Sequence, residues 1–167
     1  MKIKTLLEDI VNELGDLKNI KPYEVVPKKL GKEESYRFIT EEGDVGFIHF
    51  SHLDDEEVDD MSLEEKYYGN GYEVEYSLNG TYLQSHVESL GELLRIISTV
   101  VEAIKIHMEK SNSLLYVVYG ARKRNLGGTN QKFNLYKAVV SKHIPPGWEI
   151  GETNKSLYGP GFYIKKK

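Results

Sequence analysis

The sequence predicts an α+β fold with a mixed, mostly antiparallel sheet and helices on both of its faces. Strand-like runs form two hairpins within residues 36–87, an amphipathic run spans 90–108, and a continuous apolar run covers 114–120. A strand, helix, strand unit that follows a meander indicates a mixed sheet covered by helices. At 167 residues the chain is long enough for one domain with a two-layer core, so we expect residues 1–167 to form a single domain.

Residues 1–30 are expected to form a helix followed by a connector. Apolar residues recur at helical spacing over residues 3–14, and Gly15 provides a stop. Two prolines and mixed charge in the following stretch indicate a connector. Acidic residues interrupt the apolar positions of the amino terminus, which a secretory signal does not tolerate, so we expect a cytoplasmic protein with no membrane partner.

The middle of the chain predicts two hairpins around an acidic insertion. "YRFIT", "EEGD" and "VGFIHFS" indicate two strands and a turn, and "YEVEYSL" alternates apolar and polar residues before Asn79-Gly80, the strongest two-residue hairpin signal. Its partner strand is "TYLQSHV". Residues 52–71 hold eight Asp and Glu residues and predict a solvated loop or a short surface helix, because burying that much unpaired charge is costly.

The second half predicts the elements that complete the sheet. Apolar residues from Leu90 to Met108 form a broad helical stripe, and "LLYVVYG" is typical of a central strand that is buried on both faces. "QKFNLYKAVVSKH" predicts a second helix, ended by Pro145-Pro146. "WEIGE" and "GFYIKKK" predict two closing strands.

Charge is distributed unevenly along the chain. Residues 1–90 carry 9 Lys/Arg and 21 Asp/Glu, whereas residues 91–167 carry 13 and 5. Such asymmetry arises most often because two halves of a fold attract one another, and less often because a charged surface meets a partner. The chain has no cysteine, which excludes disulfides and thiolate chemistry. His49 and His52 point to opposite faces of a strand, so no metal site is expected.

A basic loop provides the strongest anion-binding candidate. Positive side chains, glycines and the start of a predicted helix come together there, and such features bind phosphate or carboxylate groups. No Gly-Lys-Ser/Thr follows at the spacing of a Walker A loop. The predicted anion-binding residues are Arg122, Lys123, Arg124, Gly127, Gly128 and Thr129.

The order of elements over residues 72–165 is similar to the GNAT acyltransferase fold. At finer grain, "STVVEAIKIHMEK", "LLYVVYGARK" and "FNLYKAVVSKH" resemble a group of small uncharacterised bacteriophage proteins over about the last 90 residues. The GNAT resemblance implies an acyl-CoA site between strand and long helix, which falls on Val87, Ser89 and Gly91. It also implies a general acid at Tyr136, and His86 is placed where a general base could work.

The implied coenzyme motif is poorly matched. Only Gly91 fits fully, and Glu88 places a negative charge where two phosphates would lie. Ser89 and Glu92 have the spacing of a capping box, in which the helix satisfies its own amino-terminal N–H groups. We therefore expect a non-catalytic phage-type accessory protein, in the host cytoplasm if phage-encoded, that needs no cofactor and binds a macromolecule, a protein rather than a nucleic acid. The alternative is a divergent N-acyltransferase that uses acetyl-CoA or another acyl-CoA.

Overall fold

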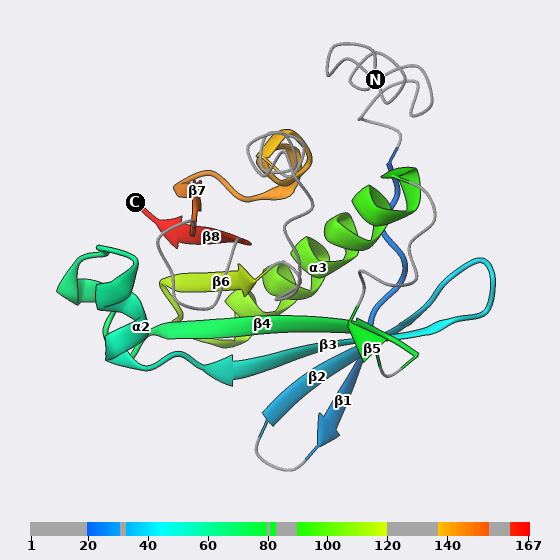
Figure 1. The fold of residues 1–167 in the computed structure, drawn as a ribbon, viewed down its shortest axis with the longest axis horizontal. Coiled ribbons are helices and arrows are strands. Elements are labelled where there is room, and N and C mark those ends of the chain that lie inside the picture. The colour runs from blue at the N-terminus through cyan, green and yellow to red at the C-terminus, as the bar shows by residue number, and fades with distance from the viewer. Residues whose placement is uncertain (1–19, 31–32, 80, 83–89, 120–136, 154–160) are drawn as a thin grey trace.

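A computed structural model gives the fold and describes residues 20–30, 33–79, 81–82, 90–119, 137–153 and 161–167. These residues form a mixed α+β structure on one mostly antiparallel sheet, with the long helix α3 lying across it (Figure 1). Among them, no helix combines the length and the apolar character that a membrane span requires.

The sheet has eight described strands. Seven follow the spatial order β1, β2, β3, β4, β6, β8, β7, and β5 pairs with β4 alongside that path. All pairs are antiparallel except β4 with β6. The strands are β1 (Val26–Leu30), β2 (Glu33–Ile39), β3 (Val45–His52), β4 (Gly71–Leu78), β5 (Thr81–Tyr82), β6 (Leu115–Tyr119), β7 (Trp148–Glu152) and β8 (Gly161–Lys166).

The parallel pair confirms the mixed sheet that the element order predicts. Between β4 and β6 the chain runs through α3 (Leu90–Lys110), because parallel neighbours need a crossover connection. The pairing starts at Gly71 with Leu115 and ends at Val74 with Val118, so the second half of β4 extends past the described pairing with β6. The finer expectation, a GNAT-like scaffold with helices on both faces, stays a prediction.

Both predicted hairpins of the meander are present in the described residues. β2 and β3 pair around residues 40–44, where the N–H of Gly43 donates to the carbonyl of Thr40 at 2.9 Å and Gly43 has a φ of +89°. β4 and β5 pair beyond Asn79, whose φ of +52° is the left-handed conformation that an Asn-Gly turn requires.

The prediction for residues 1–30 is wrong in its last part. Val26–Leu30 form β1, which borders the sheet and pairs with β2. Pro27 and two lysines make this stretch look like a connector, but an edge strand tolerates both, since one side of its backbone makes no ladder bonds. The helix expected over residues 3–14 lies outside the described residues.

The acidic insertion is folded. Asp54 caps α2 (Asp55–Asp60) by accepting from the N–H of Glu57 at 3.0 Å, and η2 (Glu65–Tyr67) follows. A small apolar cluster lies under these two helices and packs on one face of β6; it contains Leu53, Val58, Met61, Tyr67, Leu115 and Val117. The hydroxyl of Tyr67 donates to the Lys166 carbonyl at 2.8 Å. Of the two expectations for residues 52–71, the short surface helix is confirmed by α2 and the solvated loop is not, because the stretch forms a structured cover with an acidic exterior.

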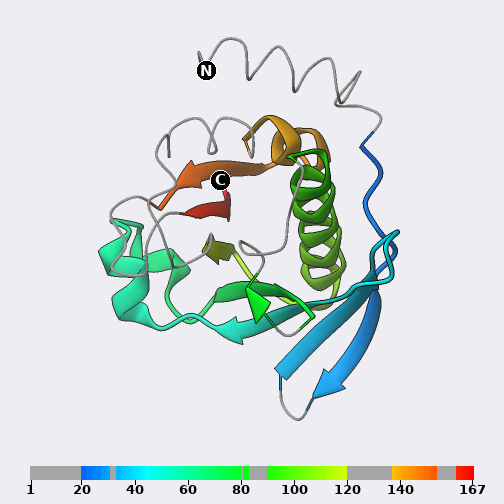
Figure 2. The ribbon, with the colours of Figure 1, turned by 45° about the vertical axis from the view of Figure 1, so that its right-hand side comes forward.

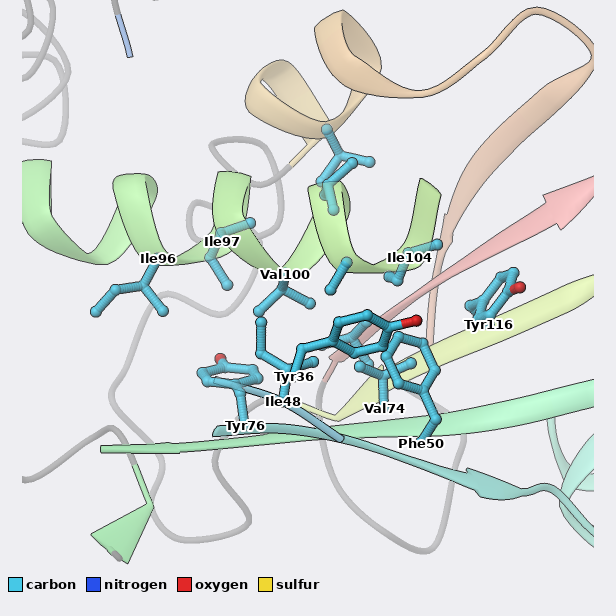
Figure 3. Close-up of a cluster of buried hydrophobic side chains, with 14 of the residues drawn as sticks. Tyr36, Ile48, Phe50, Val74, Tyr76, Ile96, Ile97, Val100, Ile104 and Tyr116 are labelled. Atoms are coloured by element: carbon cyan, nitrogen blue, oxygen red, sulfur yellow. The ribbon is translucent and has the colours of Figure 1, made fainter. Parts of the chain in front are cut away.

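The main core lies between α3 and the opposite face of the sheet. Its helical side chains point down onto the strands, as Figure 3 shows for Ile96, Ile97, Val100 and Ile104. Because neighbouring residues of a strand face opposite sides, Tyr116 and Val118 of β6 enter this core while Leu115 and Val117 enter the cluster under α2. β6 is therefore buried on both faces, as its apolar run predicts.

The elements after β6 agree with the sequence where they are described. Residues 137–143 are helical and lie beside α3 in Figures 1 and 2, with Val140 in the main core. The two predicted closing strands are β7 and β8, and β8 lies between β6 and β7. The first part of the second predicted helix falls outside the described residues.

Candidate functional site

Most of the sequence-predicted site residues fall outside the described chain. The structure describes Gly91, which lies half-buried in the first turn of α3. It does not describe the other candidates, so their roles stay predictions: Tyr136, His86, Val87, Ser89, Arg122, Lys123, Arg124, Gly127, Gly128 and Thr129. Among the described residues, two groups of hydrogen-bonded polar side chains lie at the two ends of α3.

At the amino-terminal end of α3, Tyr23 covers the first turns of the helix. Its hydroxyl lies 2.8 and 2.9 Å from the two carboxylate oxygens of Glu92, and its backbone N–H donates to Thr99 Oγ1 at 2.9 Å. Burial, and then the bond to Glu92, raises the pKa of Tyr23 to about 12, so the hydroxyl stays protonated and donates. Glu92 is thereby held next to the positive end of the helix dipole.

Arg95 strengthens this amino-terminal cover. Its guanidinium lies 3.8 Å from the centre of the Tyr23 ring, its Nε donates to the carbonyl of Lys21 at 2.9 Å, and it pairs with Glu41. The Tyr23 ring also stacks on Phe38 at 5.9 Å between ring centres. The segment before β1 is therefore bound to both α3 and the sheet.

At the carboxyl-terminal end of α3, His107 lies at the centre of a buried polar network. It is 3% exposed, and its ring stacks on Phe50 at 4.5 Å between centres. The Tyr116 hydroxyl lies 2.7 Å from His107 Nδ1, and Ser111 Oγ lies 3.1 Å from the same nitrogen. Tyr116 is near this end of the helix in Figure 3. Two hydroxyls thus converge on one imidazole nitrogen.

The other nitrogen of His107 faces a carboxylate. His107 Nε2 lies 3.7 Å from Glu34 Oε2, and the side chain of Glu34 is 39% exposed. Burial lowers the pKa of His107 and raises that of Tyr116 to about 12, so at neutral pH the imidazole is neutral and the phenol is protonated. The assignment consistent with these partners puts the proton on Nε2, towards Glu34, and leaves Nδ1 to accept.

A surface groove opens beside this network. It has a volume of about 370 Å³, and Ser111 is one of its lining residues. Met108, Leu114, Pro145 and Trp148 contribute apolar walls, and Lys105, Glu109, Asn112, Ser113 and Lys166 contribute polar groups. The Trp148 ring lies 6.0 Å from that of Tyr116, so the groove and the buried network are adjacent.

The two histidines of β3 form no metal site with the described residues. His49 bonds to Ser35 Oγ at 2.7 Å, and the His52 ring lies 4.6 Å from that of Tyr72. Alternation along β3 places the two histidines on opposite faces, as the sequence predicts. In the described part of the chain, no three His, Asp or Glu side chains come together as metal ligands.

The acidic exterior of residues 54–65 consists of exposed carboxylates. Seven of its carboxylates are exposed, and none of them forms an ion pair within the described part of the chain: Asp54, Asp55, Glu56, Asp59, Asp60, Glu64 and Glu65. The described ion pairs between the two halves of the chain join Arg95 to Glu41 and His107 to Glu34.

The sequence did not single out the network around His107. A signal was present, because His107 follows Val100 and Ile104 at helical spacing and so falls on the buried stripe of α3. A histidine at such a position needs polar partners in the core. Those partners lie on other elements, and their sequence positions do not reveal them.

Comparisons with known proteins identify no relative of this chain. The chain matches no family model, and no curated protein or solved structure shows significant similarity to it.

Proposed function

We propose that this chain is a phage-type accessory protein on a GNAT-like scaffold, which binds a host or phage protein through its acidic surface and does not transfer acyl groups from coenzyme A. The observation that carries the proposal is the acidic exterior of residues 54–65, with seven exposed carboxylates that have no described counterion. A surface of one sign steers an oppositely charged partner and repels a polyanion such as a nucleic acid.

The folded state of this segment supports a recognition role. α2 and η2 hold the carboxylates on a fixed frame, because Val58, Met61 and Tyr67 are buried beneath them. A pre-ordered surface loses less conformational entropy on binding than a disordered tail does. The acidic groups can thus select a partner by their arrangement as well as by their charge.

The amino-terminal end of α3 supports the exclusion of coenzyme A. A GNAT enzyme binds the pyrophosphate at this end, where free N–H groups and the helix dipole attract anions. Here the Glu92 carboxylate occupies that electrostatic position, held by the Tyr23 hydroxyl. A diphosphate would have to approach a carboxylate in a partly buried setting.

The alternative, a divergent N-acyltransferase, is supported by the strand order. β4 and β6 are parallel neighbours that α3 connects, and their described pairing stops after Val74 and Val118. In GNAT enzymes the acyl-CoA enters between the corresponding strands. We retain this alternative for that reason.

Thermal unfolding with acetyl-CoA separates the two functions. We expect millimolar acetyl-CoA to leave the melting temperature unchanged, whereas a bound cofactor would raise it by mass action. Glu92→Gln tests the cause, because removal of the carboxylate charge should allow a small rise if repulsion alone excludes the coenzyme. A clear rise for the wild type would support the acyltransferase and contradict the proposal.

Partner binding is tested with a charge-neutralised variant. Asp55→Asn, Glu56→Gln and Asp60→Asn together remove three exposed charges and leave Asp54, the cap of α2, in place. We expect a partner protein that the wild type captures to bind this variant weakly or not at all. The same partner should bind the purified wild-type protein more weakly as the salt concentration rises. Equal binding by the variant, or a salt-sensitive shift with DNA in place of a protein, would contradict the proposal.

A further inference from the structure

We propose that Ser111 is the nucleophile of an ester-cleaving site at the carboxyl-terminal end of α3, with His107 as its general base and the adjacent groove as its substrate site. This activity goes beyond the proposed function and does not depend on it. It uses the end of α3 opposite to the one that a coenzyme would occupy, and its substrates are small carboxylic esters.

The first support is the arrangement of serine, histidine and carboxylate. Ser111 Oγ lies 3.1 Å from His107 Nδ1, and Glu34 Oε2 lies 3.7 Å from Nε2 on the far side of the ring. A base within hydrogen-bond reach of a hydroxyl, itself oriented by a third group, is the geometry that activates a serine. Such contacts are commonly longer without substrate.

The second support is access. Ser111 is half-buried and lines the groove, whereas His107 is 3% exposed and lies behind it. A substrate can reach the serine from solvent while the base stays shielded from water. The walls formed by Met108, Leu114 and Trp148 suit a short apolar acyl group.

The third support is electrostatic. Accepting a proton from Ser111 makes His107 an imidazolium in the last turn of α3, where the helix dipole favours positive charge. Glu34 favours the same charged form from β2. These two interactions are stronger after proton transfer than before it, which is the requirement for lowering a reaction barrier.

Other groups around His107 are consistent with a base that is neutral at rest. Lys110 of α3 and His52 of β3 disfavour a second positive charge, and burial acts in the same direction. The Tyr116 hydroxyl of β6 is the nearer donor to His107 Nδ1, at 2.7 Å against 3.1 Å for Ser111 Oγ, so Ser111 passes its proton to this nitrogen only after the Tyr116 hydrogen turns away from it. The ring of Tyr72 of β4 packs edge-on against the imidazole. Both phenols have raised pKa values through burial and so remain uncharged.

Asn112 can stabilise the oxyanion. Its backbone N–H follows the nucleophile directly and donates to no other described residue, and its side chain is exposed at the groove. The N–H after a nucleophile is a recurrent oxyanion donor. One such donor contributes about 100- to 1,000-fold in rate where it has been removed in other enzymes.

The reaction balances with water as the co-reactant. Ser111 Oγ bonds to the ester carbonyl carbon as its proton passes to His107 Nδ1, and the carbon–alkoxide bond breaks as that proton passes to the leaving oxygen. Water then gives a proton to His107 and its oxygen to the acyl carbon. The acyl–Oγ bond breaks, the proton returns to Ser111, and a carboxylic acid and an alcohol are released.

Covalent labelling tests the nucleophile. The purified full chain is incubated with a fluorophosphonate, and the modified peptide is identified by mass spectrometry. We expect the label on Ser111, no label on Ser111→Ala, and full labelling of Ser141→Ala, a matched control at an exposed helical serine. Melting curves verify that both variants fold. No label on the folded wild type, or unchanged labelling of folded Ser111→Ala, would overturn the proposal.

The pH profile of labelling tests the positioning residue Glu34. Labelling should rise with pH as His107 becomes neutral, with a midpoint below the ordinary histidine value of 6.5 because burial lowers the pKa of His107. Because Glu34 raises the pKa of His107, Glu34→Gln should move the midpoint to lower pH and slow the plateau rate by about tenfold, a modest part of what a positioned base contributes. A folded Glu34→Gln protein with the wild-type midpoint and rate would show that Ser111 reacts without this base, and would overturn its assignment.

Discussion

The two ends of α3 are both fixed by tyrosine, but with different exposure. At the amino-terminal end, Tyr23 is 7% exposed, but it bonds to Glu92 and packs under Arg95, which are both half-buried. At the carboxyl-terminal end, Tyr116 bonds to His107 within the core, where both side chains are nearly inaccessible. The contact between Tyr23 and Glu92 holds the segment before β1 on the helix. The contact between Tyr116 and His107 keeps a neutral imidazole buried beside the groove.

The difference shows how burial changes what one kind of contact can do. A hydrogen bond near water contributes little net stability, because water replaces it when it breaks. The same bond in the core controls which atoms carry protons, since an unpaired polar group there is costly. We therefore expect mutations at the carboxyl-terminal end to have the larger effects.

The largest effect is expected from Phe50→Ala. Phe50 is 2% exposed and stacks on His107, so its removal should lower the free energy of unfolding by about 3–5 kcal/mol through lost burial and a new cavity. Urea unfolding measures the change. Phe47→Ala, on the opposite face of the same strand and half-buried, should cost less. Equal losses would mean that the core at this end of α3 is not packed as described.

Tyr116→Phe should have the next largest effect. It keeps the ring but removes the hydroxyl nearest His107 Nδ1, and we expect a loss of about 1–3 kcal/mol from the incompletely satisfied imidazole. The matched change is Tyr36→Phe, whose hydroxyl makes a longer contact, 3.4 Å to Glu34, among the described residues. If Tyr36→Phe were the more damaging in urea unfolding, the network would not be centred on His107.

Acid should weaken the fold through His107. Burial holds its pKa below 6.5, so the unfolded chain binds the extra proton more readily. Stability should therefore be complete above the unfolded pKa and fall as pH drops from there towards the lower folded value. His143 contributes in the same direction. Urea midpoints compared at pH 7.5 and about pH 5.5, a span that crosses the unfolded value, should shift less in His107→Gln. An unchanged shift would place the titration elsewhere.

The smallest effect is expected at the amino-terminal end. Tyr23→Phe removes the hydroxyl bond to Glu92 and should cost about 0.5–1.5 kcal/mol. Glu41→Gln is the control, because the Glu41 side chain is 77% exposed and a surface ion pair of this kind contributes about 0–1 kcal/mol. A Tyr23→Phe loss larger than that of Tyr116→Phe would reverse the comparison between the two ends.

The sequence predicts most of the described architecture because local patterns dictate it. The apolar stripe of α3, the continuous apolar run of β6 and the Asn79 turn each specify an element from neighbouring residues alone. β1 could not be predicted from its own residues, because Pro27 and the lysines of this strand are equally typical of a connector. Whether the stretch forms a strand depends on its pairing with β2. The burial of one side of residues 52–71 could not be predicted, because acidic residues outnumber the apolar residues Val58 and Met61 in that stretch.

The network around His107 could not be predicted in the same way. Glu34, His107 and Tyr116 lie on β2, α3 and β6, and they meet only when the sheet and helix are packed together. No periodicity links their sequence positions. The acyl-CoA residues, by contrast, follow from a family resemblance, and those candidates remain predictions except for the position of Gly91 in α3.

The central position of β6 has a consequence for synthesis on the ribosome. Its neighbours are β4, which is translated before it, and β8, which is translated after it. Until β8 emerges, one edge of an apolar strand stays unpaired and open to mispairing. We expect β6 to leave the ribosome before its partner β8 is available. A nascent chain stalled before Gly161 should therefore recruit chaperones, whereas a chain that includes β8 should not.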